Sequence, residues 1–542
     1  PDRMSIRTRR TLFSLIVFFA VCALGGMVLS QQVGAQSAQD ESTFRDGLKS
    51  FSAVYDIVAK NYAEPLTGEM PDKAIYDGAI PEMLHTLDPH SSFYDPKAYA
   101  KMKEDQHGKY YGVGMLIQPQ NGKVVVVYPI ENSPAFRAGV HPGDVITSID
   151  GASAQGMNSD DVANRLKGPR GTKVNVTMTR VGASSPLNFD LVRDEIPNAS
   201  IDLSYEIRPG IGYLHIRQFQ ETTGREFDDA VEAFGPNLKG LVLDLRGNPG
   251  GVLVEAVSVC DRLLKRGQVI VSQRGRAFPE QVYRATHGNE GDAFPIVVVV
   301  NRGTASAAEI VSGALQDHDR ALIAGETTFG KGLVQTVYTL SDNTGLALTT
   351  YHYFTPSGRL IQRNYNGVSL YDYYYNHDQQ PQDDKDREVK LTDSGRTVYG
   401  GGGITPDIKI EAPKSNPFQD LLLERDAFLG FTEDYLAHRT ANKDFQVDDA
   451  VMGEFKQYLA AQNYDYTPQE LEANIDWVKM NVKASIFATQ FGLTSELKVK
   501  ADWDPEIQQA VGLMPQAAQL EQHVQQVLAQ KEAALNKGPA SR

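Results

Sequence analysis

Two residues of this chain are suited to hydrolytic chemistry together: Ser306 and Lys331, which lie 25 positions apart. Ser306 follows an apolar run of β-branched residues and a glycine turn, and it begins a pattern of small residues typical of a helix. This context places its hydroxyl at a helix N-terminus, where outward-pointing N–H groups stabilise a developing oxyanion. Lys331 lies between two glycines, so its side chain can approach such a site closely. The pair predicts a serine hydrolase that works without histidine.

Lys331 can act as a base only when its amine is neutral, and the pKa of a free lysine is near 10.4. The site must therefore desolvate the lysine and keep carboxylates away from it. Phe329 and Leu333 supply an apolar setting, and Gln335 could hold the amine by hydrogen bonding without adding charge. His318 is the alternative base, but a helix that starts at residue 306 would place it about 18 Å along the axis from the serine.

The predicted hydrolase needs two donors for its oxyanion. The backbone N–H of Ala307, or of Ser306 itself, is one candidate, and the glycine pair Gly250–Gly251 is the other. The pair ends a buried strand and opens a helix, and glycines let a substrate backbone come close. A glycine-rich turn between a strand and a helix is weak evidence by itself, because many such turns bind phosphate or only reverse the chain. No P-loop accompanies this turn, which argues against a nucleotide site. Without further context, a helix-capping Ser306 and a solvated surface Lys331 stay open as alternatives.

The elements that must position these residues alternate between strand and helix from 200 to 412, which predicts an α/β core. Buried strands are expected at 240–245 and 296–300, and each continues into a helix. The polar, tyrosine-rich stretch 367–395 is predicted to be a mobile loop. Further strands are expected at 321–325, 333–340 and 346–354.

A separate β-rich module is expected at 108–195. It has a glycine-x-glycine loop followed by apolar residues, two short helices and several strands. This order resembles a PDZ domain, and the resemblance implies that a peptide C-terminus adds as a strand beside residues 115–118. The alternative is a β-domain without a ligand, whose glycines serve only its turns. The substrate-binding residues implied are Gly112, Val113, Gly114 and Met115, the N–H groups of the last three cradling the peptide carboxylate.

Taken together, these motifs resemble the C-terminal processing peptidases, also called tail-specific proteases, over about residues 45–412. The resemblance implies a crotonase-like α/β core, with the PDZ module as substrate reader and gate. It also implies that Ser306 is the nucleophile, Lys331 the general base and Gln335 its orienting amide. Two features depart from the family pattern: the segment 415–542, and the pair Tyr351–His352. The oxyanion donors implied are Gly250, Gly251 and Ala307, and the matching strings cover residues 87–92, 244–251, 303–310, 330–335, 353–362 and 402–407.

The two ends of the chain predict an exported protein with helical flanks. Four arginines precede the apolar run Leu12–Leu29, so residues 1–35 are predicted to be a secretory signal, or an anchor in the inner membrane where the signal stays uncleaved. The expected location is therefore periplasmic or otherwise extracytoplasmic. Residues 40–104 form a helical segment with no evident chemistry. Residues 415–542 form a helical region whose stretch 516–534 is amphipathic and solvated, followed by a disordered tail; the helical segments make a homodimer plausible.

Composition narrows the function further. The net charge of −15 argues against a nucleic-acid partner, and no metal-ligand spacing or nucleotide motif is present, so no metal or cofactor is expected. Cys260 is the one cysteine left once the signal is removed, which leaves no intrachain disulfide. The sequence thus predicts an exported serine endopeptidase that binds the C-termini of unfolded or tail-exposed proteins, with or without an adaptor. Two rivals remain: a non-catalytic PDZ scaffold, and a crotonase-like acyl-CoA enzyme, which the export signal disfavours.

Overall fold

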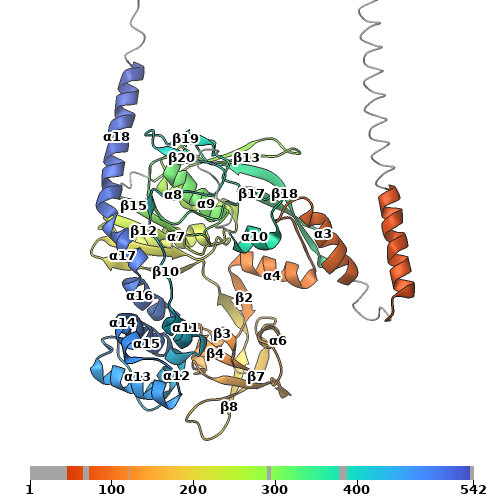
Figure 1. Ribbon diagram of the computed structural model, residues 1–542, viewed down its shortest axis with the longest axis vertical. Coiled ribbons are helices and arrows are strands. Elements are labelled where there is room, and N and C mark those ends of the chain that lie inside the picture. Colours follow the sequence, from red (N-terminus) through yellow and green to blue (C-terminus); the bar gives the residue numbers. More distant parts are fainter. Residues whose placement is uncertain (1–44, 65–72, 121, 290–293, 377–386, 537–542) are drawn as a thin grey trace, which may run out of the picture. The chain divides into compact units, whose positions relative to one another are not determined.

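The computed structural model of the chain describes residues 45–64, 73–120, 122–289, 294–376 and 387–536 (Figure 1). The signal predicted at 1–35 and the tail predicted at the C-terminus lie outside these residues. The chain divides into two compact units, residues 1–83 and residues 84–542.

The first unit contains a helix over residues 45–61. Apolar residues spaced along it, among them Phe51, Val54 and Ile57, are exposed. None of the described helices combines the length and hydropathy that a membrane span requires.

A six-stranded sheet forms the centre of the second unit, in the order β10-β11-β12-β15-β16-β21. Every residue of β12 (Gly240–Asp244) and β15 (Ile296–Val300) is buried, as expected for parallel strands covered on both faces. One face packs against α7 (Thr223–Ala233), α8 (Leu253–Leu263) and α9 (Ala307–Asp317). This mixture of helices and sheets confirms the predicted α/β class, while its crotonase-like character stays a prediction. The other strands are β10 (Ile201–Arg208), β11 (Ile211–Ile216), β16 (Leu322–Gly325) and β21 (Ile408–Lys409).

A second, antiparallel sheet carries the segment that follows Lys331. Its central strand β18 (Gly345–Phe354) pairs with β17 (Leu333–Thr339) along one edge. On the other edge, β1 (Ser92–Tyr94) and β13 (Val269–Arg274) pair with the two ends of β18. The register places Gln335 directly opposite Thr349. Strand β14 (Gln281–Arg284) completes the sheet.

The β-rich module has a core of its own. Strands β3 (Met115–Gln120), β4 (Lys123–Pro129), β5 (Val145–Ile149) and β7 (Lys173–Thr179) form its sheet with β6 (Ala152–Ser153) and β8 (Leu187–Val192). Helices α5 (Pro134–Arg137) and α6 (Ser159–Leu166) begin at Ser133 and Asn158, whose side chains accept capping hydrogen bonds. A short ladder between β2 (Lys109–Gly112) and β9 (Asp194–Pro197) joins the chain that enters the module to the chain that leaves it.

The C-terminal helices fall into two groups. Helices α11 to α15, which begin at Pro417 and end at Phe491, share a separate hydrophobic core. Helices α16 (Leu493–Trp503), α17 (Pro505–Gly512) and α18 (Met514–Asn536) instead pack on the second face of the six-stranded sheet. The prediction that 516–534 is solvated is therefore wrong in part, because Ala517 and Val524 are buried. Helix α18 is amphipathic as predicted, but its apolar face packs on the sheet.

Candidate active site

The predicted catalytic residues meet in one cavity of about 480 Å³ in the second unit. It lies where the N-terminal end of α9 meets the start of β17. His90 and Tyr353, for which the sequence analysis predicts no role, also line it. The predicted residues in its lining are Ser306, Lys331, Gln335, Gly250, Gly251 and Ala307.

Ser306 stands at the N-cap position of α9 but does not act as an ordinary cap. Its backbone is strained, with φ 54° and ψ −115°, a region that non-glycine residues rarely occupy. The Glu309 N–H, which an N-cap side chain would accept from, donates to the Ser306 carbonyl oxygen at 2.8 Å instead. The hydroxyl is therefore available for chemistry, in agreement with a nucleophile rather than with the helix-cap alternative.

Glu309, which the sequence analysis missed, connects Ser306 to the loop of residues 328–332 that carries Lys331 (the lysine loop). This fully buried carboxylate accepts hydrogen bonds from the N–H groups of Ser306 at 2.8 Å, Gly330 at 2.7 Å and Lys331 at 2.9 Å, and from the hydroxyl of Thr328. Burial raises the pKa of the Glu309 carboxyl, and the four donors oppose that shift because they stabilise the ionised form. One side chain thus fixes the backbone of both predicted catalytic residues.

Glu309→Gln is expected to lower kcat/KM by about 10- to 100-fold, because the new amide group would face N–H donors that have lost their acceptor. Steady-state cleavage of an unfolded reporter measures the effect, with Glu232→Gln on the exposed surface of α7 as the matched control. Wild-type activity in Glu309→Gln would show that the carboxylate does not position the site.

Lys331 is half-buried, and the desolvation of its amine lowers its pKa below the usual value. Its Nζ makes no hydrogen bond or ion pair with any described residue. The expectation that carboxylates stay away is only partly met, because Glu309 and Asp88 both act to raise the pKa of Lys331. Desolvation outweighs them, so the net direction favours the neutral amine that a base requires.

The amide nitrogen of Gln335 is held by a hydrogen bond to β18. Its Nε2 donates to the Thr349 hydroxyl at 3.0 Å, and that hydroxyl donates to Asp88 Oδ1 at 3.1 Å. Asp88 belongs to the helical segment for which the sequence indicated no chemistry. The one feature of the sequence that could have pointed to Asp88 was the motif Leu-Asp-Pro-His-Ser-Ser at 87–92, which is part of the family resemblance.

The three predicted oxyanion donors are not equivalent. The N–H of Gly250 donates to Asn248 Oδ1 at 2.8 Å, and the N–H of Ser306 is held by Glu309. In the part of the chain that the structure describes, the N–H groups of Gly251 and Ala307 have no acceptor. Gly251 adopts φ 138°, and a Cβ there would lie 1.9 Å from Phe219 O, so no other residue fits. Gly251 and Ala307 are therefore the available pair.

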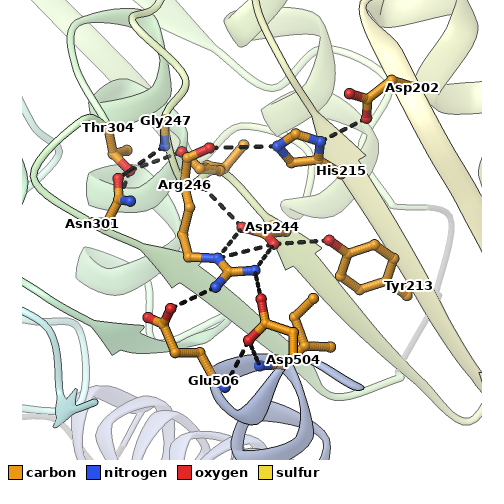
Figure 2. Close-up of polar contacts among 12 residues, drawn as sticks. Asp202, Tyr213, His215, Asp244, Arg246, Gly247, Asn301, Thr304, Asp504 and Glu506 are labelled. Atoms are coloured by element: carbon orange, nitrogen blue, oxygen red, sulfur yellow. Dashed lines mark hydrogen bonds and ion pairs between the residues drawn. The ribbon is translucent and has the colours of Figure 1, made fainter. Parts of the chain in front are cut away.

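The turn that carries the glycines is anchored at its first residue, Arg246. Figure 2 shows its guanidinium between Asp244, at the end of β12, and Asp504 and Glu506, at the start of α17. The nearest contacts are 2.7 Å to Asp244, 2.9 Å to Asp504 and 2.8 Å to Glu506. The C-terminal helices thus hold the turn from Arg246 to Gly251, here called the oxyanion turn, from outside the cavity.

The predicted carboxylate loop lies in the β-rich module and does not line the catalytic cavity. Gly112, Val113, Gly114 and Met115 are all buried. The Ser133 hydroxyl donates to Gly114 O at 2.8 Å, which fixes the loop, while Leu116 at the start of β3 is 45% exposed. A peptide that adds beside β3 would therefore meet an exposed leucine next to a rigid loop.

Comparisons with known proteins identify three regions of this chain. The profile of peptidase family S41 matches residues 210–369, a PDZ profile matches 125–180, and a profile for the C-terminal helical domain of probable PDZ-proteases matches 418–470. The predicted PDZ domain and the helical C-terminal region are thereby confirmed.

Curated relatives match over most of their length. The carboxy-terminal-processing protease of Bartonella bacilliformis is 38% identical over 361 residues, which cover 65% of this chain and 80% of that protein. Carboxy-terminal processing protease CtpA of Bacillus subtilis is 30% identical over 393 residues, 71% of this chain and 82% of that one. Among solved structures, the photosystem II D1 C-terminal processing protease aligns with a TM-score of 0.33 and 28% identity, covering 67% of this chain and 92% of that one.

Proposed function

This chain belongs to the carboxy-terminal processing proteases of peptidase family S41, and on that premise we propose that it is an exported serine endopeptidase with a Ser306–Lys331 dyad. It binds the C-termini of substrate proteins through its PDZ domain and cleaves them upstream. The observation that carries the proposal is the meeting of Ser306, Lys331 and two free backbone donors in one cavity.

The dyad supports an acyl-enzyme mechanism. The Ser306 hydroxyl attacks the scissile carbonyl while the neutral Lys331 amine takes its proton, and the N–H groups of Gly251 and Ala307 stabilise the oxyanion. The ammonium then returns the proton to the leaving amine as the peptide C–N bond breaks. Water attacks the acyl-Ser306 ester with Lys331 again as base, which releases the carboxylate product and restores the serine.

In this proposal the PDZ domain selects the substrate, and the N-terminal segment directs the protein to export. The loop from Gly112 to Met115 precedes β3, the strand beside which an extended peptide would add. Export rests on the sequence alone, in which four arginines precede the apolar run Leu12–Leu29.

An unfolded reporter protein tests the proposal. The wild-type chain is incubated with a reporter that ends in apolar residues and with the same reporter ending in two aspartates, and separately with an alkyl fluorophosphonate that labels activated serines. We expect cleavage to depend on the apolar tail and the probe to add to Ser306. Tail binding without cleavage and without an adduct would instead identify a PDZ scaffold.

A further inference from the structure

The turn that follows α3 (Ile80–His85) is built around a buried aspartate. Asp88 is 6% exposed, and its Oδ1 accepts from the N–H groups of His90 and Ser91, each at 2.8 Å. Its Oδ2 accepts from the Ser91 hydroxyl at 2.7 Å. These bonds make a rigid Asx turn, so its side chains are held in fixed places.

From Asp88, one hydrogen-bonded chain leads to Gln335. An ionised carboxylate only accepts, so the Thr349 hydroxyl must donate its hydrogen to Asp88 and can only accept from Gln335. Gln335 must therefore present its Nε2 to Thr349, which fixes the orientation of its amide. Its Oε1 has no partner among the described residues and belongs to the side chain that lines the cavity with Lys331.

From His90, a second hydrogen-bonded chain leads to Gly332, the residue after Lys331. His90 Nε2 lies 2.9 Å from the Tyr373 hydroxyl, which accepts from Gln362 Nε2 at 3.1 Å. Gln362 Oε1 in turn accepts from the Gly332 N–H at 2.8 Å. Burial and then Lys331 lower the pKa of His90 to about 3, so the ring is neutral and its Nε2 can accept the tyrosine proton.

The helix that supplies Tyr373 corrects a prediction. Residues 367–395 were predicted to be a mobile loop, yet α10 (Leu370–Tyr375) places Tyr373 at 1% exposure against Phe329 and His90. Aromatic packing holds the start of this polar stretch on the lysine loop.

We propose that Asp88 is a positioning residue for catalysis: through Thr349 it orients the Gln335 amide so that Oε1 accepts a hydrogen bond from the Lys331 amine. This rests on the proposed function of Lys331 as the base. With one N–H of the amine held by Gln335, the lone pair is directed to the Ser306 hydroxyl. Asp88, from the segment 40–104 for which the sequence predicted no chemistry, thus completes the catalytic site around Lys331.

The charge of Asp88 also acts on the base. The charged and titratable groups that act on Lys331 are Glu309 from α9 and Asp88 and His90 from the turn, and Arg363 acts in turn on His90. Glu221, Tyr94 and Tyr353 line the same cavity. Of these, Asp88 and Glu309 raise the pKa of Lys331, so removal of the Asp88 charge lowers it.

The test compares pH profiles of kcat/KM for Asp88→Asn, Thr349→Val and Thr349→Ser. Thr350→Val is the matched control, because Thr350 is the next residue of β18 and its hydroxyl pairs with Thr336 instead. We expect Thr349→Val to lower kcat about 10-fold and Thr349→Ser to restore it. Asp88→Asn should lower kcat and move the rising limb of the profile to lower pH.

Equal losses in Thr349→Val and Thr350→Val, or an unshifted limb in Asp88→Asn, would overturn the role of Asp88 while leaving the Ser–Lys mechanism intact. Full activity in Lys331→Ala, measured alongside, would overturn the mechanism and this inference with it. Circular dichroism and thermal melting of each variant separate a loss of fold from a loss of positioning.

Discussion

Ser306→Ala and Lys331→Ala are each expected to lower kcat/KM for an unfolded reporter by about 10⁴-fold or more, with tail binding unchanged. Without the hydroxyl there is no acyl-enzyme, and without the amine nothing removes the serine proton. Because the two act as one unit, the double variant should be no slower than either single variant. Reporter cleavage and the binding of a fluorescent tail peptide measure the two effects separately.

Wild-type activity should rise with pH, because Lys331 is a base only when it is deprotonated. Burial lowers its pKa, so the limb should lie below the usual lysine value of about 10.4. The profile of kcat/KM between pH 6 and 11 shows this limb, and Lys109→Ala is the control, since Lys109 is exposed and paired with Glu195. A rate that is flat across the lysine titration, or tail binding lost in Ser306→Ala, would contradict the assignment.

Local patterns could predict where Ser306 lies in the fold, while its role beside Lys331 was implied by the family resemblance. A buried strand, a glycine turn and a run of small residues put Ser306 at the start of α9, and the structure has that order. What local patterns could not supply was the partner of each residue. Asp88 and Thr349 lie 261 positions apart, and they touch only because β1 pairs with β18.

Hydrogen-bond direction was a second limit of sequence reasoning. The glycine pair lies in the same cavity as Ser306, as predicted, but the N–H of Gly250 donates to Asn248. Only Gly251 and Ala307 of the predicted donors therefore have an N–H available for the oxyanion. Likewise, the amphipathic pattern of α18 indicated an apolar face without indicating what covers it.

Arg246→Leu is expected to destabilise the second unit by about 3–5 kcal/mol, because it removes the cation from among three acidic side chains. The side chain of Asp244 is 2% exposed and that of Glu506 9%, so neither can recover its hydration in place. Helix α17 would be repelled from β12, and the turn from Arg246 to Gly251 would lose its anchor. Activity should therefore fall together with stability.

The loss should be greater at pH 8 than at pH 5. Burial acts to raise the pKa of Asp244, but the ion pair with Arg246 outweighs it and the net shift is downward. The wild type therefore gains stability from this group above its usual pKa, and loses it as the pH falls through the lowered value. In Arg246→Leu the guanidinium is lost, and burial is opposed only by His215, the Tyr213 hydroxyl and the backbone N–H of residue 246. The pKa of Asp244 in the folded state therefore rises above its wild-type value, and the variant loses more stability, relative to the wild type, as the pH rises.

Urea unfolding at the two pH values, with Arg439→Leu as the control, measures both effects. Arg439 pairs with Glu454, but their side chains are 50% and 41% exposed, so that change should cost far less stability than Arg246→Leu at either pH. Equal losses in the two variants would mean that the Arg246 contacts are no stronger than a surface pair. A large loss confined to Arg246→Leu, with earlier proteolysis between α16 and α18, would show that the C-terminal helices hold the oxyanion turn in place.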